Sequence, residues 1–210
     1  MKLLIAMPSL DYMSAETTKA LTHLVMHLKD EGVDFSVSIE AGTLVYMARD
    51  RLACKAINQG YTHVLWIDAD MVFTEELLED LQFSGKDFVT GIAVSRRKPF
   101  SSCLFKSTDL EHLERWGDVD TMPKNTFEIA GCGFACVLIS VDILKAVQLR
   151  FGTCFTPMNS YGEDIAFCRR AKELGYRIFA EPAVKVGHIG HLAIFPDDVE
   201  HYRDDWAKKG

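Results

Sequence analysis

Short apolar runs alternate with amphipathic helical segments through the first 95 residues. We expect strands at 2–7, 33–39, 63–67 and 87–94, and helices at 15–31, 45–59 and 74–83. Thr74 is the expected N-cap of the third helix. The third strand, HVLWI, holds four consecutive apolar residues, which is typical of burial on both faces. The β-α-β order predicts a parallel sheet with helices on both faces and ligands bound beyond the carboxyl ends of its strands.

The second half of the chain is less regular. We expect a loop at 96–102, an insertion at 107–126, two strands around a glycine turn at 127–140, helices near 141–148 and at 163–174, and a strand at 176–180. This pattern predicts that the sheet becomes mixed. The length of 210 residues suits one domain, so the expected fold is a single α/β domain, 1–210.

Composition and charge exclude several classes of protein. The net charge of −7 argues against nucleic acid as a partner, because such domains carry a basic face. No stretch approaches the ~20 apolar residues that a membrane span needs, and MKLLIAM is too short for the core of a signal peptide. None of the six cysteines forms a CxxC pair, which favours free thiols. We therefore expect a cytoplasmic protein with no integral membrane segment.

Two aspartates follow the buried HVLWI strand at once, in the sequence HVLWIDADM. In extended chain Asp68 and Asp70 point to the same side. Two carboxylates this close repel unless a cation neutralises them, and a hard divalent cation with oxygen ligands does so. Such a cation keeps positions that diphosphate oxygens can fill. The alternative is a plain turn in which Asp70 is a capping or loop residue.

Further candidate groups lie in the second half. Glu163 and Asp164 open the helix at 163–174, where the helix dipole favours carboxylates. The functional alternative is that a glycine-hinged loop presents Asp164 to an acceptor hydroxyl as a general base. His188 and His191 follow a short strand among glycines, either as surface histidines or as ligands of an ion.

Basic residues form a third group. Arg49 lies on the helix before the HVLWI strand, and a lone arginine on a helix is usually solvated. Arg96, Arg97 and Lys98 follow the fourth strand. A charge run of this kind is more often a solvated loop, and its functional alternative is contact with phosphate or acceptor.

Three blocks together resemble the GT-A glycosyltransferase superfamily, in particular small family-2-like enzymes of bacteria and large DNA viruses. ARDRLACKAINQGYTHVLWIDADM is similar to the block that ends in Asp-x-Asp, with Asp50 where Asn is usual. GCGFACVLIS is similar to the glycine-rich segment that lines the donor sugar. GEDIAFCRRAKELGYRIFAEPAVKVGHIGH is similar to the acidic helix followed by a metal-ligand histidine. The order and spacing of the blocks agree over nearly the whole chain.

The resemblance implies a GT-A-like fold and metal-dependent transfer of a sugar from a nucleotide sugar, with Mn²⁺ or Mg²⁺ as cofactor. It implies that Asp70 is the main metal ligand, that Asp68 contacts the ribose and the metal through water, and that His188 completes the coordination. His191 is the alternative histidine. The favoured donor is a UDP sugar, and the acceptor is a glycan, glycoprotein or glycolipid.

The resemblance also assigns the remaining parts of the site. Asp164 is the implied base, with inversion preferred, and Glu163 binds the acceptor. Residues 1–95 would form the nucleotide-binding half, 96–210 would bind the acceptor and complete the metal site, and 96–126 would act as a lid. The residues implied to contact the donor are Pro8, Ser9 and Asp11 near base and ribose, Arg49 at the nucleotide end, and Gly131 and Cys132 under the sugar.

Two other functions compete with sugar transfer. A nucleotidyltransferase or sugar-nucleotide hydrolase would use the same kind of sheet. The segment after the first strand, AMPSLDYMSAET, has neither the glycine nor the lysine that a pyrophosphorylase phosphate loop needs, nor a dehydrogenase's G-x-G-x-x-G. The other alternative is a non-catalytic module of a larger protein that binds a sugar nucleotide.

Overall fold

The computed structural model describes residues 1–96, 100–109, 112–117, 119–158 and 161–190. Its α-helices are α1 Ala15–Asp30, α2 Val45–Asn58, α3 Leu77–Phe83, α4 Val141–Phe151 and α5 Glu163–Glu173, and one 3₁₀ turn spans Val119–Thr121. Its strands are β1 Lys2–Pro8, β2 Asp34–Glu40, β3 His63–Ile67, β4 Met71–Val72, β5 Phe88–Ile92, β6 Leu104–Thr108, β7 Leu113–Arg115, β8 Phe127–Ile129, β9 Gly131–Cys132, β10 Cys136–Ser140, β11 Ile178–Lys185 and β12 Gly187–His188.

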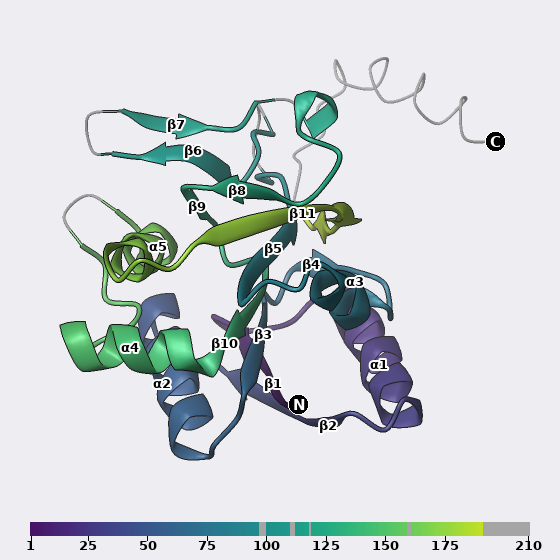
Figure 1. Cartoon of the computed structure of the whole chain (residues 1–210). Helices are drawn as coiled ribbons and strands as arrows, with labels where there is room; N and C mark the ends of the chain where they lie inside the picture. The colour runs from purple at the N-terminus through teal and green to yellow at the C-terminus, as the bar shows by residue number, and fades with distance from the viewer. Residues whose placement is uncertain (97–99, 110–111, 118, 159–160, 191–210) are drawn as a thin grey trace.

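A mixed sheet of seven strands forms the centre of the molecule, in the order β2-β1-β3-β10-β5-β11-β8 (Figure 1). β1 pairs in parallel with both β2 and β3, as the alternating first half predicts. β10 is inserted antiparallel between β3 and β5. The predicted fold class, a mixed sheet with a parallel N-terminal half, is confirmed.

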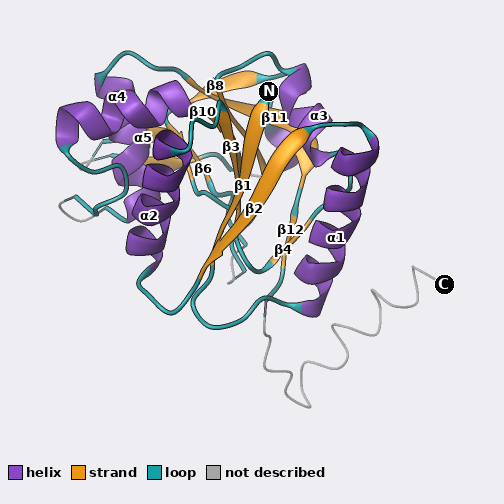
Figure 2. Ribbon diagram, turned by 90° about the horizontal axis from the view of Figure 1, so that it is seen from below, coloured by secondary structure: helices purple, strands orange, loops and turns teal. Residues whose placement is uncertain are grey.

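Helices cover both faces of this sheet. α1 and α3 pack on one face, and α2, α4 and α5 pack on the other, as Figure 2 shows from below. Alternate residues of β1 divide between the two cores: Leu3 and Ile5 face α1, whereas Leu4 and Ala6 face α2. Because both faces of β1 and β3 are buried, these two strands read as continuous apolar runs.

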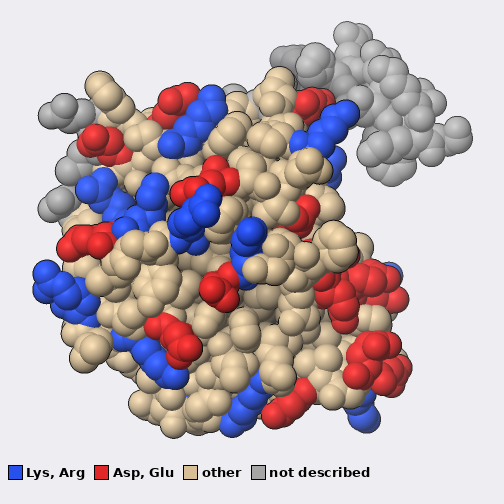
Figure 3. All heavy atoms as spheres, viewed as in Figure 1, with Lys and Arg blue, Asp and Glu red and all other residues tan. Residues whose placement is uncertain are grey.

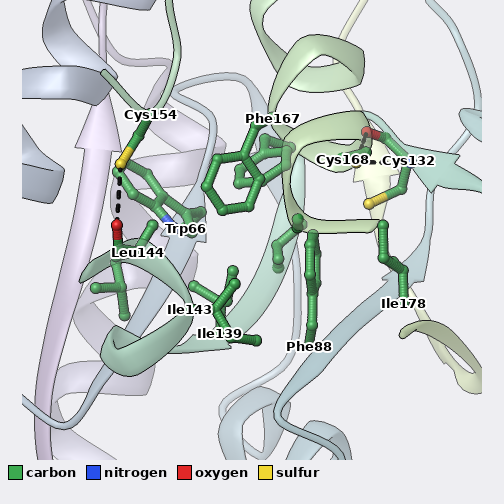
Figure 4. Close-up of a cluster of buried hydrophobic side chains, with 14 of the residues drawn as sticks. Trp66, Phe88, Cys132, Ile139, Ile143, Leu144, Cys154, Phe167, Cys168 and Ile178 are labelled. Atoms are coloured by element: carbon green, nitrogen blue, oxygen red, sulfur yellow. Dashed lines mark hydrogen bonds between the residues drawn. The ribbon is translucent and has the colours of Figure 1, made fainter. Parts of the chain in front are cut away.

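Aromatic rings fill the core between the sheet and α5 (Figure 4). Phe155 and Phe167 stack with ring centroids 4.8 Å apart, and Trp66 meets Phe155 edge-on at 5.1 Å. Phe134 packs on both phenylalanines at 5.1 and 5.4 Å. This packing joins the strand that precedes Asp68 to the helix that begins with Glu163.

Several predicted boundaries are wrong. α3 begins at Leu77 after a turn, and Glu76 rather than Thr74 is its N-cap. The predicted insertion at 107–126 contains regular structure: it includes β7, which pairs with β6, and β6 pairs in turn with β9 to form a separate three-stranded sheet. The last strand of the central sheet begins at Ile178 and runs to Lys185, five residues beyond the predicted end.

Acidic and basic side chains both occur on the face that Figure 3 shows, and acidic side chains gather toward its lower right. Within the described part of the chain, none of the helices has the length and apolar character needed to cross a bilayer.

Candidate functional site

The site begins where β3 ends. Ile67 is the last residue of the strand, and Asp68, Ala69 and Asp70 turn the chain into β4. The backbone N–H of Asp68 donates to the carbonyl of Ala135, 3.2 Å away, so the turn is fixed against the start of β10. Asp68 and Asp70 are both about a quarter exposed, at 28% and 27% of their side chains. The turn thus presents two carboxylates at the carboxyl end of a buried strand.

A short antiparallel pair of strands places His188 beside Asp70. β12 pairs with β4 so that His188 lies opposite Met71, the residue after Asp70. The backbone N–H of Ile189 donates to the carbonyl of Asp70 at 2.9 Å. His188 Nε2 consequently lies 3.4 Å from Asp70 Oδ2. The structure brings these predicted partners together, whereas His191 lies outside the described residues.

The other ring nitrogen of His188 fixes the tautomer. Nδ1 lies 2.9 Å from the carbonyl oxygen of Val94, which can only accept, so Nδ1 carries a proton. Nε2 of the neutral ring is then an acceptor aimed at a carboxylate oxygen. Two acceptors in this position need a proton or a cation between them. The hydrogen bond to Asp70 raises the pKa of His188 against the lowering effect of burial.

Asp70 also forms an ion pair with Arg96, whose guanidinium contacts the same oxygen, Oδ2. Burial raises the pKa of Asp70, but the hydrogen bond and charge of His188 and the charge of Arg96 outweigh it, so the pKa is lowered overall. Asp70 is therefore held as a carboxylate between the guanidinium of Arg96 and the ring of His188. These groups show where a cation would be stabilised.

Asp68 faces a different set of groups. Its Oδ1 accepts a 2.8 Å hydrogen bond from Nη2 of Arg49, and Nε of Arg49 lies 3.7 Å from Oε1 of Glu163. The Arg49 side chain is only 4% exposed, and its guanidinium lies over the ring of Phe134. Burial raises the pKa of Asp68 to about 6 even though Arg49 opposes the shift, and the nearby Asp70, Asp164 and Glu163 add to it. Arg49 is thus a buried partner of the carboxylates rather than a solvated side chain, and its contact with a nucleotide stays a prediction.

The first turn of α5 supplies the other carboxylates, and we call Asp68, Glu163 and Asp164 the acidic cluster. Asp164 Oδ1 accepts from the backbone N–H of Ile165 at 2.7 Å. Burial raises the pKa of Asp164, Arg49 lowers it, and Glu163 raises it further. Arg49 therefore lies between Asp68 and the start of α5 and joins the two sides of the acidic cluster.

The glycine turn before β10 borders this cluster at a residue that sequence reasoning missed. A Cβ on Gly133 would lie 3.6 Å from Asp164 Oδ2, and Gly133 is partly exposed. Gly131 is buried, and a Cβ there would meet Thr108 at 2.9 Å, which is too close. Packing thus favours glycine at 131. The Gly-x-Gly spacing of Gly131 and Gly133 was the sequence signal that could have identified Gly133 as a neighbour of the acidic cluster.

Cys132 is fully buried, and its carbonyl accepts from the Cys168 thiol at 3.7 Å (Figure 4). Its thiol therefore belongs to the core between β9 and α5. Contact of Gly131 or Cys132 with a donor sugar stays a prediction. Such a contact would have to come from the backbone of these residues.

A hollow lies beyond the carboxyl end of β1. Pro8 and Ser9 are buried, and Ser9 donates from its backbone N–H to Glu40 at 2.8 Å and from its hydroxyl to Tyr12 at 3.1 Å. Asp11 is exposed. The hollow has a volume of about 390 Å³ and lies between the ends of β1 and β2; it is lined by Leu10, Asp11, Gly42, Thr43 and Leu44. Of the three predicted residues, Asp11 alone lines it.

A second hollow adjoins the Asp70–His188 pair. It has a volume of about 280 Å³ and is lined by Val94, Ser95, Arg96, Phe100, His188 and Gly190. Within the described ranges, no three His, Cys, Asp or Glu side chains gather into a metal-binding group. The carboxylate and imidazole of the pair nevertheless suit a hard or borderline divalent cation, and the imidazole is oriented by Val94 as ligand histidines are. Such a cation would take its remaining ligands from water or a bound diphosphate.

Asp50, the residue that departs from the superfamily pattern, anchors the loop before α5. Its Oδ1 accepts from the backbone N–H groups of Cys154 and Phe155 at 2.9 and 2.8 Å, and its Oδ2 accepts from the Thr153 hydroxyl at 2.7 Å. Arg170 of α5 donates to the carbonyls of the same loop. Asp50 follows Arg49 on α2, so one helix both fixes this loop and supplies the cluster's guanidinium.

We expect Asp50→Ala to lower the free energy of unfolding by about 2–4 kcal/mol, because it leaves two backbone N–H groups without their charged acceptor. Asp50→Asn keeps one acceptor oxygen and should cost about 1 kcal/mol or less. Urea unfolding of both variants and the parent tests this. Equal losses in the two variants would contradict the anchoring role.

Comparisons with known proteins show the fold. A scan against protein-family models finds no match, and neither does a search of curated proteins. Among solved structures, A197 from STIV matches with a TM-score of 0.59 and 19% identity, over 94% of this chain and 91% of that one. These values indicate a shared fold and carry no statement about activity.

Two structures of glycosyltransferases also match. GalNAc-T7 with UDP, GalNAc and Mn²⁺ gives a TM-score of 0.61 at 10% identity, over 91% of this chain and 43% of that one. Drosophila β1,4-galactosyltransferase 7, a mutant in complex with manganese, UDP-Gal and xylobiose, gives 0.54 at 11%, over 95% and 79%. A UDP-glucose pyrophosphorylase bound to UDP-glucose gives 0.53 at 10%, with both chains fully covered. The fold is thus GT-A-like, and this chain spans less than half of GalNAc-T7.

Proposed function

We propose that this protein is a metal-dependent glycosyltransferase that moves a sugar from a nucleotide sugar, favoured to be a UDP sugar, to an acceptor hydroxyl. The observation that carries the proposal is the meeting of Asp70 and His188 beside a hollow, with the acidic cluster close by. The two glycosyltransferases of like fold are recorded with UDP or UDP-Gal and manganese, which supports the same classes of ligand here.

The donor would lie along the carboxyl ends of the parallel strands. The hollow beside Leu10, Asp11 and Leu44 would take the nucleoside, since it lies at the ends of β1 and β2 and offers apolar walls and one carboxylate. Asp68 would face the ribose, with Arg49 holding its orientation. In this arrangement residues 1–95 bind the nucleotide and 96–210 bind the acceptor and complete the metal site, as the sequence predicts.

Each group would then have one task in the transfer. Asp70 and His188 would hold Mn²⁺ or Mg²⁺, and a bound divalent cation supplies compensation for the negative charge that grows on the leaving diphosphate. Asp164 would take the proton of the acceptor hydroxyl as that oxygen attacks the sugar C1, which inverts the configuration. Glu163 would bind the acceptor, and the raised pKa of Asp164 brings this carboxylate closer to the pKa that suits a general base near neutrality.

Release of nucleoside diphosphate tests the proposal. The protein is incubated with UDP, GDP and dTDP sugars, with Mn²⁺ or with EDTA, and we expect slow release of the diphosphate from at least one donor that depends on Mn²⁺. Formation of inorganic pyrophosphate from UTP and a sugar 1-phosphate would instead indicate a nucleotidyltransferase. Saturable donor binding without turnover, with a panel of glycan acceptors present, would indicate a binding module.

A further inference from the structure

Arg96 competes with a metal ion for the same carboxylate oxygen. Its Nη1 pairs with Oδ2 of Asp70, which is the oxygen that faces His188 Nε2 at 3.4 Å. A divalent cation bound between Asp70 and His188 would meet the guanidinium at a few ångströms, where like charges repel. Arg96 and the cation therefore cannot share this position, and one must leave when the other arrives.

The backbone that leads to Arg96 is held by hydrogen bonds, while the side chain of Arg96 is half exposed. Val94 and Ser102 form an antiparallel bridge, and the Ser95 N–H donates to the Ser101 carbonyl at 2.8 Å. Gly190 lies against the Arg96 backbone, where an added Cβ would come within 3.2 Å of its carbonyl oxygen. The guanidinium-bearing side chain is 51% exposed. Rotation of the side chain alone can thus release Asp70.

The negative charge of a bound diphosphate would give Arg96 a second partner. Its side chain lines the hollow that adjoins the Asp70–His188 pair, so a diphosphate bound to a cation at that pair would lie within its reach. Arginine pairs with phosphate through its planar fork of donors. Arg49 is not available for this task, because its side chain is 4% exposed and already faces Asp68 and Glu163.

We propose that Arg96 is the counter-ion of Asp70 in the metal-free protein and moves to the donor diphosphate when the metal binds. This inference rests on the proposed function. Its consequence is cooperative binding: the metal alone must displace Arg96, whereas the metal with a nucleoside diphosphate gives Arg96 a new partner. The coupling is reciprocal, so each ligand tightens the other by the same factor.

The test measures binding of Mn²⁺ alone, by calorimetry and by the electron paramagnetic resonance of free Mn²⁺, and then binding of UDP at saturating Mn²⁺ by calorimetry. Arg96→Gln is compared with the parent protein and with Arg177→Gln, which removes an equal charge from an exposed pair with Glu128. We expect Arg96→Gln to bind Mn²⁺ alone about 3- to 10-fold more tightly, as loss of an exposed ion pair allows. The same variant should bind UDP in the presence of Mn²⁺ more weakly than the parent.

Opposite signs of the two effects distinguish this proposal from a static ion pair. If Arg96→Gln leaves both affinities unchanged while Asp70→Ala removes Mn²⁺ binding, Arg96 has no role and the proposed function stands. If Mn²⁺ binds neither the parent nor Arg96→Gln, with or without UDP, both the inference and the proposed metal site fail. Arg177→Gln should match the parent throughout, and a shift there would show that net charge alone explains the result. Thermal unfolding confirms that each variant is folded.

Discussion

Asp70→Ala should abolish Mn²⁺-dependent binding of the donor, with a loss of affinity of about 100-fold or more. Asp70 is the carboxylate on which His188 and Arg96 converge, and its lowered pKa keeps it ionised at neutral pH. Loss of a residue that only orients a ligand typically costs 10–100-fold in metal affinity, so loss of a direct ligand should cost about 100-fold or more. Calorimetric titration of UDP and of a UDP sugar, each with Mn²⁺, measures the effect.

Two further variants sharpen this experiment. Asp70→Asn keeps the shape of the side chain and removes its charge, so it separates the loss of a ligand from the loss of packing. Asp142→Asn removes a carboxylate that is 82% exposed and pairs with Lys145 on α4, and it should bind donor as the parent does. An unchanged titration of Asp70→Ala would remove Asp70 from the metal site and with it the basis of the proposed function.

Much of the fold follows from local patterns. The prediction for β3 matches the structure to the residue, because VLWI is a continuous apolar run that ends abruptly in charge. The prediction for α5 is right to within one residue, because acidic residues open the helix and its apolar residues recur with the helical period. The predicted start of α3 is wrong. Thr74 offers a capping hydroxyl, but the chain forms a turn before Leu77. A propensity for capping does not decide where tertiary packing lets a helix begin.

The partners within the site depend on long-range register. His188 approaches Asp70 because β12 pairs with β4, and these strands are two residues long with no pattern of their own. The spacing of Asp68 and Asp70 predicts that they point the same way, yet Asp68 accepts from Arg49 while Asp70 faces His188. The turn between the two residues breaks the alternation of an extended chain. No local signal reports that difference.

Asp164→Asn should leave donor binding intact and lower the rate of sugar transfer by about 10²- to 10⁴-fold, the range that general base catalysis supplies. The prediction follows from the position of Asp164 in the first turn of α5, where one oxygen is held by the N–H of Ile165 and the other lies beside the partly exposed Gly133. An asparagine retains the first contact and cannot take a proton. Donor affinity by calorimetry and transfer by product formation give the two readouts, and full activity would remove Asp164 as the base.

The pH dependence of transfer gives an independent check on the base. Burial and the charge of Glu163 raise the pKa of Asp164, while Arg49 lowers it, so the carboxylate holds its proton to a higher pH than an ordinary aspartate. A base must be ionised, so activity at saturating donor should fall as the pH is lowered through that raised pKa, above the usual value of about 3.9. Glu163→Gln removes a neighbouring charge that raises the pKa and should therefore move this acid limb to lower pH. A limb that stays in place or moves upward would show that another group controls the rate.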